Sequence, residues 1–182
     1  VGRQLEALSE IFKHVLNFGK ETLCIQEELD LAQSYFYLVK KRYSVPVELE
    51  ISVEEELKEA EIPKLIVQPL VENAIVHGLE EKENGAKILV RVRKRIKNRE
   101  QLVEITVADN GVGTDQARVR AWMRSESDPS NAFALRNIDE RVRLTSGENC
   151  GLRFYSRKGA GTIVKVLLRY SEQTEKQMRI SP

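Results

Sequence analysis

The stretch from Pro63 to Gly78, PKLIVQPLVENAIVHG, constrains the fold more than any other part of the sequence. At about 100° per residue, one arc of a helix collects its apolar side chains, which are Val67, Leu70, Val71, Ala74 and Ile75. Pro69 lacks the N–H that a helix interior needs, so we expect the regular helix to begin within one turn of it and to end at Gly78. The stretch therefore predicts a helix with one face against a core.

Asn73 and His77 lie one turn apart at the edge of that arc. An amide oxygen can bind a metal ion and an imidazole can contact a phosphate, so the pair is typical of a helix that borders a cleft. A buried asparagine and a satisfied histidine would give the same pattern. The choice between these two interpretations depends on the rest of the chain.

Further motifs follow in order: VADNGVG at 107–113, ALRNIDERVRL at 134–144 and KGAGT at 158–162. Together with QPLVENAIVHG, they resemble the nucleotide-binding motifs of sensor histidine kinases of the autolysin-regulator type. Those kinases share an ATPase superfamily with gyrase, the heat-shock chaperones and the mismatch-repair proteins. The resemblance covers residues 5 to 168 and implies phosphoryl transfer from Mg-ATP to a histidine.

The resemblance implies roles for side chains in and near the helix. Asn73 would bind Mg²⁺ through its side-chain oxygen, and Glu72 would act through a water molecule or as an acid–base group. His77 and Arg141 would contact phosphate oxygens. Positioning and charge stabilisation would then carry most of the catalysis.

Asp109 stands at the end of a predicted strand, where a carboxylate can accept the exocyclic amine of adenine. The Asn-Gly after it is by itself an ordinary turn signal, although glycine lets a backbone approach a nucleotide without a Cβ. The family pattern places nucleotide contacts in this turn and in the two later motifs. Besides those named above, it assigns Asp109, Gly111, Gly113, Leu135, Asn137, Gly159, Gly161 and Thr162.

The chain departs from the family pattern at Ala132 and Ala134, where glycines are expected ahead of Arg-Asn. A methyl group restricts positive φ and adds bulk beside the phosphates. The polar stretch 125–131 has the composition of a mobile loop and corresponds to the family's lid over the nucleotide.

Three functions compete for these motifs. The first is a kinase catalytic domain that phosphorylates a histidine upstream of this chain, and the second is an ATP-hydrolysing machine of the gyrase or mismatch-repair kind. The third is a nucleotide-binding module with little or no turnover, which Ala132 and Ala134 keep open. The hydrolysing machine needs a glutamate as general base four residues before the magnesium asparagine, and Pro69 occupies that position. We expect the kinase domain.

Residues 1–45 predict two amphipathic helices, over 3–18 and 26–43, with an extended join between them. They resemble the last part of the family's dimerisation and phosphoacceptor region. They therefore either pack on the domain that follows or form a bundle with a partner chain, as in a homodimer. His14 lacks the Asn-Pro-His-Phe context of the family's acceptor, so we expect the acceptor to lie further upstream.

Alternation of apolar and polar side chains predicts strands over 46–52, 87–97, 102–109, 152–157 and 162–170. The expected fold class is α+β, a two-layer α/β sandwich whose mixed, mainly antiparallel sheet carries helices on one face. Residues 46–170 would form the ATP-binding catalytic domain, and residues 171–182 a polar tail.

One face of the strand over 87–97 and its continuation is basic, with Arg91, Arg93, Arg95, Lys97 and Arg99. A nucleic-acid stripe and a solvated sheet face paired with residues such as Glu104 are the two alternatives. No aromatic residue is interleaved and the net charge of the chain is only +1. We therefore expect the solvated face and no nucleic-acid partner.

Cys24 and Cys150 lie far apart and lack metal-ligand spacing, which favours a reducing compartment. No apolar run approaches the roughly 20 residues of a membrane span. We expect a cytoplasmic domain that makes no membrane contact itself. The resemblance implies that it comes from a membrane-anchored bacterial sensor that acts on a response regulator.

Overall fold

The structure is a computed structural model that describes residues 21–42, 46–78, 85–97, 99–117, 121 and 133–171. Several expectations lie outside these residues: the helix over 3–18 with His14, the lid over 125–131, Ala132, and the tail beyond residue 171. The elements in chain order are β1 (Thr22–Cys24), α2 (Ile25–Val39), η1 (Lys40–Arg42), β2 (Val47–Val53), η2 (Glu55–Leu57), β3 (Glu61–Pro63), α3 (Val67–Asn73), η3 (Ala74–Gly78), β4 (Ala86–Lys97), β5 (Glu100–Asp109), α5 (Phe133–Ser146), β6 (Gly151–Arg157) and β7 (Gly161–Leu168).

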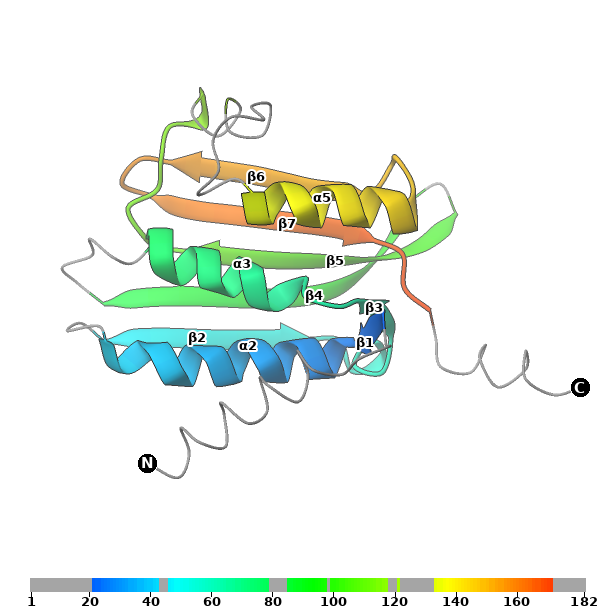
Figure 1. The fold of residues 1–182 in the computed structure, drawn as a ribbon, viewed down its shortest axis with the longest axis horizontal. Helices are drawn as coiled ribbons and strands as arrows, with labels where there is room; N and C mark the ends of the chain where they lie inside the picture. The colour runs from blue at the N-terminus through cyan, green and yellow to red at the C-terminus, as the bar shows by residue number, and fades with distance from the viewer. Residues whose placement is uncertain are drawn as a thin grey trace, which may run out of the picture.

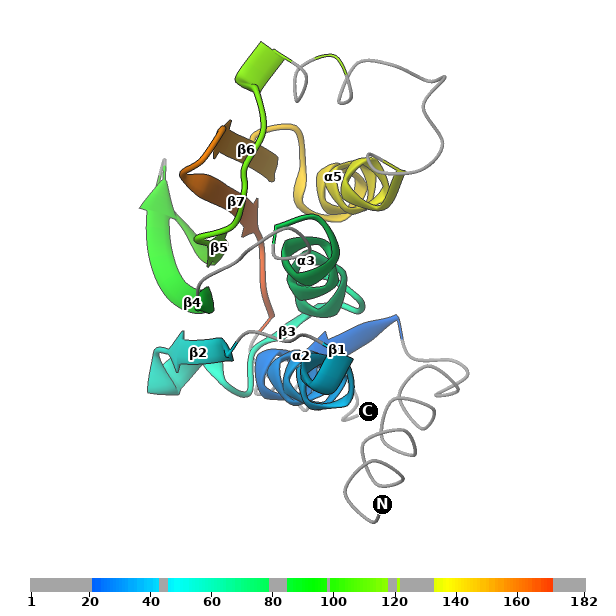
Figure 2. The same ribbon diagram turned by 90° about the vertical axis from the view of Figure 1, so that its left-hand side faces the viewer.

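The main sheet has five strands in the order β2-β4-β5-β7-β6 (Figure 1). The β2–β4 pair is parallel, and the three other pairs are antiparallel. The helices α2, α3 and α5 cover one face of this sheet (Figure 2). The expected two-layer sandwich with a mixed, mainly antiparallel sheet is therefore confirmed.

The core lies between the sheet and the helices, and α3 is at its centre. The five apolar side chains of the predicted arc, Val67, Leu70, Val71, Ala74 and Ile75, are at most 3% exposed. The α-helix begins two residues before Pro69, as expected. It does not continue as an α-helix to Gly78, because its last five residues widen into the π-helical turn η3.

The helix α2 belongs to the same core. Its buried side chains, Ile25, Leu29, Ala32 and Phe36, join the cluster that includes the sheet and α3. Of the two arrangements expected for this helix, it adopts packing on the following domain. A division at residue 45 would cut through this core, so we propose that the ATP-binding unit includes α2.

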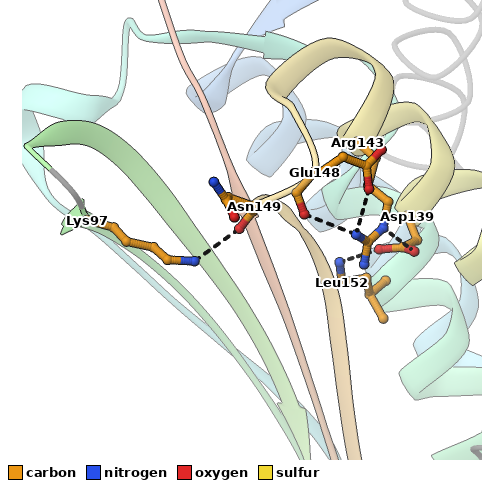
Figure 3. A network of polar contacts seen from close by, with 6 residues as sticks. All are labelled: Lys97, Asp139, Arg143, Glu148, Asn149 and Leu152. Carbon is orange, nitrogen blue, oxygen red and sulfur yellow. Dashed lines mark hydrogen bonds and ion pairs between the residues drawn. The ribbon is translucent and has the colours of Figure 1, made fainter.

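The helix α5 is fixed to the sheet through its C-terminal half (Figure 3). The Asp139 carboxylate accepts the Leu152 N–H of β6 at 2.6 Å and the Arg143 Nε–H at 2.8 Å. Arg143 Nη1 also donates to the Glu148 carbonyl at 3.2 Å, and Lys97 Nζ donates to the next carbonyl at 3.2 Å. These contacts tie α5, the turn after it and the end of β4 together.

The sheet face without helices carries the basic side chains. Arg95 Nη2 lies 2.8 Å from a carboxylate oxygen of Glu104 on the next strand, and Lys165 Nζ lies 3.8 Å from the same oxygen. The expected cross-strand pairing with Glu104 is confirmed. Ile96, which the alternation assigns to the buried face, is instead 76% exposed, because the end of β4 extends beyond the helical layer (Figure 1).

In the described part of the chain, none of the helices has the length and apolar character to cross a membrane.

We expect Leu29→Ala to lower the free energy of unfolding by about 2–5 kcal/mol, because it leaves a cavity in the core that α2 shares with the sheet. Leu144→Ala makes the same chemical change on α5 at a side chain that is 87% exposed, and should cost less than about 0.5 kcal/mol. Urea unfolding of both variants measures the difference. Similar values for the two would contradict the assignment of α2 to this core.

Candidate functional site

The predicted site residues can be placed relative to one end of the main sheet. Asp109, the last residue of β5, lies opposite Thr162 at the start of β7. The C-terminal end of α3, the N-terminal end of α5 and the β6–β7 turn lie at the same end, on the left of Figure 1. Segments that are far apart in the sequence therefore meet there.

The turn after β5 is held by side chains on its own residues. The Asp109 carboxylate accepts the Gly111 N–H at 2.8 Å. Asn110 pairs with the start of β4, since its Oδ1 accepts the Lys87 N–H at 2.8 Å and its own N–H donates to the Lys87 carbonyl at 3.2 Å. The turn is thus held by hydrogen bonds within the protein itself.

The chain that follows this turn lies directly on the β6–β7 hairpin. Gly113 has φ +59°, and a Cβ there would stand 2.1 Å from the carbonyl oxygen of Arg157. The Val112 carbonyl accepts the Gly159 N–H at 2.6 Å. A positive φ and a backbone in contact both require glycine at position 113.

Gly161 makes the reciprocal contact from the hairpin. Its φ is +91°, and a Cβ would stand 2.1 Å from the carbonyl oxygen of Asp109. Gly159 also has a positive φ of +77°, but a Cβ there would meet nothing within 4 Å. The missing side chains of Gly113 and Gly161 therefore allow the two turns to touch, whereas at Gly159 the missing side chain matters only for the positive φ.

Ser156 connects the two turns, and the sequence reasoning did not identify it. Its hydroxyl accepts the Thr114 N–H at 2.8 Å and lies 2.9 Å from the hydroxyl of Thr162. It also lies 3.2 Å from the Gly161 carbonyl. A serine within an alternating strand does not by itself indicate a functional role. The alternation does predict that Ser156 is buried on the helix side of β6.

The end of α3 supplies the helical part of the site. Glu72 is exposed and Asn73 is half-buried at the last α-helical position. The π-helical turn η3, which includes the backbone of His77, packs against β5 and β7. Single π-helical turns are frequent at functional sites. The placement of the His77 side chain lies outside the described residues.

The predicted residues of α5 divide into two groups. Leu135 is only 5% exposed and contributes to the core, while Asn137 is exposed near the start of the helix. Arg141 is not brought to the same end, because its Nη2 donates to the Leu65 carbonyl at 3.0 Å, ahead of α3. Asn73 is at the other end of α3, which is about 10 Å long.

The described residues contain no group of three or more His, Cys, Asp or Glu side chains arranged to hold a metal ion. Mg²⁺ commonly takes one or two protein ligands and completes its octahedron with phosphate and water oxygens. A single amide oxygen from Asn73 therefore fits a magnesium ion that arrives with a nucleotide, and does not fit a metal held by protein ligands alone.

Comparison with known proteins gives matches to a family, to individual proteins and to solved structures. Residues 58–172 match the family described as histidine kinase-, DNA gyrase B- and HSP90-like ATPase. The chain is 32% identical over 168 residues to the sensor histidine kinase YesM of Bacillus subtilis. It is also 32% identical over 171 residues to the sensor histidine kinase/phosphatase LytS of Staphylococcus aureus.

These matches cover 92% of this chain in both cases, but only 27% of YesM and 29% of LytS. The chain thus spans less than a third of the length of these relatives. Among solved structures, the mycobacterial sensor histidine kinase MprB has a TM-score of 0.58 at 17% identity, and the match covers 84% of this chain and 99% of that one. At this identity the likeness concerns the fold alone.

Gly161→Ala and Gly159→Ala form a matched pair, since both force alanine into a positive φ. We expect Gly161→Ala to reduce the free energy of unfolding by about 1–3 kcal/mol more than Gly159→Ala does, because only Gly161 has backbone where the methyl group would stand. Urea denaturation measures both. Equal losses would mean that the contact between the two turns relaxes without cost.

Proposed function

Because this chain belongs to the histidine kinase-, DNA gyrase B- and HSP90-like ATPase family, we propose that it is the ATP-binding catalytic domain of a sensor histidine kinase. In this proposal it transfers the γ-phosphate of ATP to a histidine elsewhere in a longer protein. The observation that carries the proposal is the convergence at one end of the sheet of the strand-end Asp109, two turns in backbone contact and the helix end with Asn73.

The adenine end of the site is assigned to Asp109. Its carboxylate stands at the end of β5 beside a turn that is held by hydrogen bonds within the protein, so it can accept the adenine amine with little reorganisation. The backbone of Gly111 and Gly113 would border the base on one side. Gly161 and Thr162, which face Asp109 across the strand pair, would border the site on the other.

The phosphate end is assigned to the last residues of α3 and the first of α5. Asn73 would hold Mg²⁺, which when bound neutralises charge on the phosphates. Glu72 is exposed beside it and would act through a water molecule or as an acid–base group. His77 would contact phosphate oxygens, and Asn137 would approach the nucleotide from α5.

The proposed reaction is a single phosphoryl transfer. A nitrogen of the acceptor imidazole forms a bond to the γ-phosphorus while the bond to the β–γ bridging oxygen breaks, and ADP leaves. The chain's residues hold the nucleotide and the transferring group in line, and most of the rate enhancement comes from positioning and charge stabilisation.

The two competing functions have less support. A hydrolysing machine would need a general base four residues before Asn73, and that residue is Pro69 in the first turn of α3. A binding module without turnover would rest on Ala132 and Ala134. The names of YesM and LytS, which describe sensor kinases, favour transfer. By the same resemblance we propose a homodimeric, membrane-anchored parent protein whose cytoplasmic part acts on a response regulator.

Asp109→Asn should weaken ATP binding at least about tenfold, or about 1.4 kcal/mol, because an amide can present a donor to the adenine amine. The fold should persist, since asparagine Oδ1 can still accept the Gly111 N–H. Isothermal titration calorimetry measures the affinity. Asp30→Asn, an exposed change on α2, is the matched control, and equal affinity in the two variants would contradict the adenine assignment.

Asn73→Ala should abolish the magnesium dependence of ATP binding while it leaves the fold intact, because Asn73 is half-buried at the edge of the apolar arc. ATP titrations with and without Mg²⁺ test this, with the exposed Asn149→Ala as control. If the variant unfolds, or keeps its magnesium dependence, Asn73 is a packing residue.

The printed chain should bind ATP without phosphorylating itself. It contains two histidines, of which His14 lacks the acceptor context and His77 belongs to the nucleotide helix. Incubation with γ-labelled ATP should give no acid-labile label, whereas the longer protein with its upstream segment should be labelled. Label on His14, identified by its loss in His14→Gln, would place the acceptor within this chain.

A further inference from the structure

The start of α3 is held by a carboxylate from another helix. Glu28 of α2 is 0% exposed. One of its oxygens accepts the Leu65 N–H, and the other accepts the N–H groups of Ile66 at 2.9 Å and Val67 at 2.8 Å. Glu28 therefore pairs N–H groups that the start of a helix otherwise leaves unpaired.

Leu65 is held from both sides. It is one of two non-glycine residues of positive φ in the described chain, with φ +60°, a conformation that L-residues adopt only when their surroundings impose it. Its N–H is bound by Glu28 of α2 and its carbonyl by Arg141 of α5. Three helices thus meet at this residue.

Arg141 is also electrostatically coupled to Glu28. Burial raises the pKa of the Glu28 carboxyl, while the three N–H groups and the positive charge of Arg141 act against that rise. Among the described residues, the buried Nε of Arg141 has no hydrogen-bond partner. The guanidinium is therefore anchored at Leu65 through Nη2.

We propose that Glu28 and Arg141 are a positioning pair, which fixes the start of α3 and thereby places Asn73 at its other end. This inference rests on the proposed function of Asn73, and it replaces the phosphate contact that the family resemblance implied for Arg141. The helix α3 is short and tightly packed: it has seven residues, and Val67, Leu70 and Val71 are fully buried. A displacement at its first turn is carried to Asn73.

The test is a double-mutant cycle with Glu28→Gln, Arg141→Met and the double variant. Glu48→Gln and Arg153→Met, both exposed on strands, are the matched controls. The first readout is the gain in ATP affinity on addition of Mg²⁺, from calorimetry. We expect each single variant to reduce that gain about tenfold, and the double variant to be no worse than either, because both act through one element.

The second readout needs no nucleotide. In ¹H–¹⁵N spectra both single variants should shift the amide signals of residues 71–74, and both should lower the free energy of unfolding non-additively. A direct phosphate contact by Arg141 predicts a different outcome: additive losses of ATP affinity, no effect of Glu28→Gln on the Mg²⁺ gain, and unchanged nucleotide-free spectra around Asn73. That outcome would overturn the proposal.

Two further outcomes are decisive. If Glu28→Gln does not fold, Arg141→Met and Arg141→Lys test the proposal instead. Arg141→Met should lower the free energy of unfolding without nucleotide. Arg141→Lys should restore it, because lysine keeps a donor for the Leu65 carbonyl. Unchanged stability in both overturns the proposal. If the unaltered chain binds no ATP, the proposed function fails, while the spectra and unfolding still show whether the pair positions α3.

Discussion

The arrangement of the helices depends on one buried carboxylate, because the sequence around α3 supplies no cap of its own. Ile66 occupies the position before the helix and makes no side-chain hydrogen bond to it, and Pro69 in the first turn has no N–H. Glu28 supplies the missing acceptor from 37 to 39 residues away. The central helix is therefore not an autonomous unit, and its geometry is a property of the contact between α2 and α3.

The site combines this helix with two turns of the sheet that hold each other in place. Gly113 and Gly161 let two turns pack backbone to backbone, and Ser156 closes the remaining gap between them. The strand side of the site is consequently rigid in itself. The helix side takes its position from a contact at the far end of α3, so the two halves of the site are held by separate means.

Regular periodicity made most of the fold predictable, and the failures have specific physical causes. The apolar arc of α3 and the β4–β5 hairpin are as expected, because their side chains follow one period throughout. Five apolar residues on one arc fit an α-helical and a π-helical turn equally well. The sequence pattern therefore did not indicate η3. Glu28 is visible in the sequence as a charged residue on the apolar face of α2, three residues after Ile25. Its hydrogen-bond partners could not be predicted, because they are distant in sequence. The phosphate contact of Arg141 was assigned from the family resemblance. A resemblance between motifs does not indicate side-chain geometry, such as the hydrogen bond from Arg141 to the Leu65 carbonyl.

The small β1–β3 ribbon lies at one end of the domain (Figure 1), and its position has a consequence for how the domain can move. Cys24 and Ser171 both flank Glu61, one through the ribbon and one through an isolated bridge, so the first and last parts of the described chain lie side by side. The ribbon lies at the side of the domain opposite to the end of β5 that carries Asp109 (Figure 1). A rotation of the domain about the ribbon would therefore displace the end of the sheet with Asp109 more than the end beside the ribbon. In the proposed kinase function, the nucleotide is thus held at the end of the domain that such a rotation would move furthest.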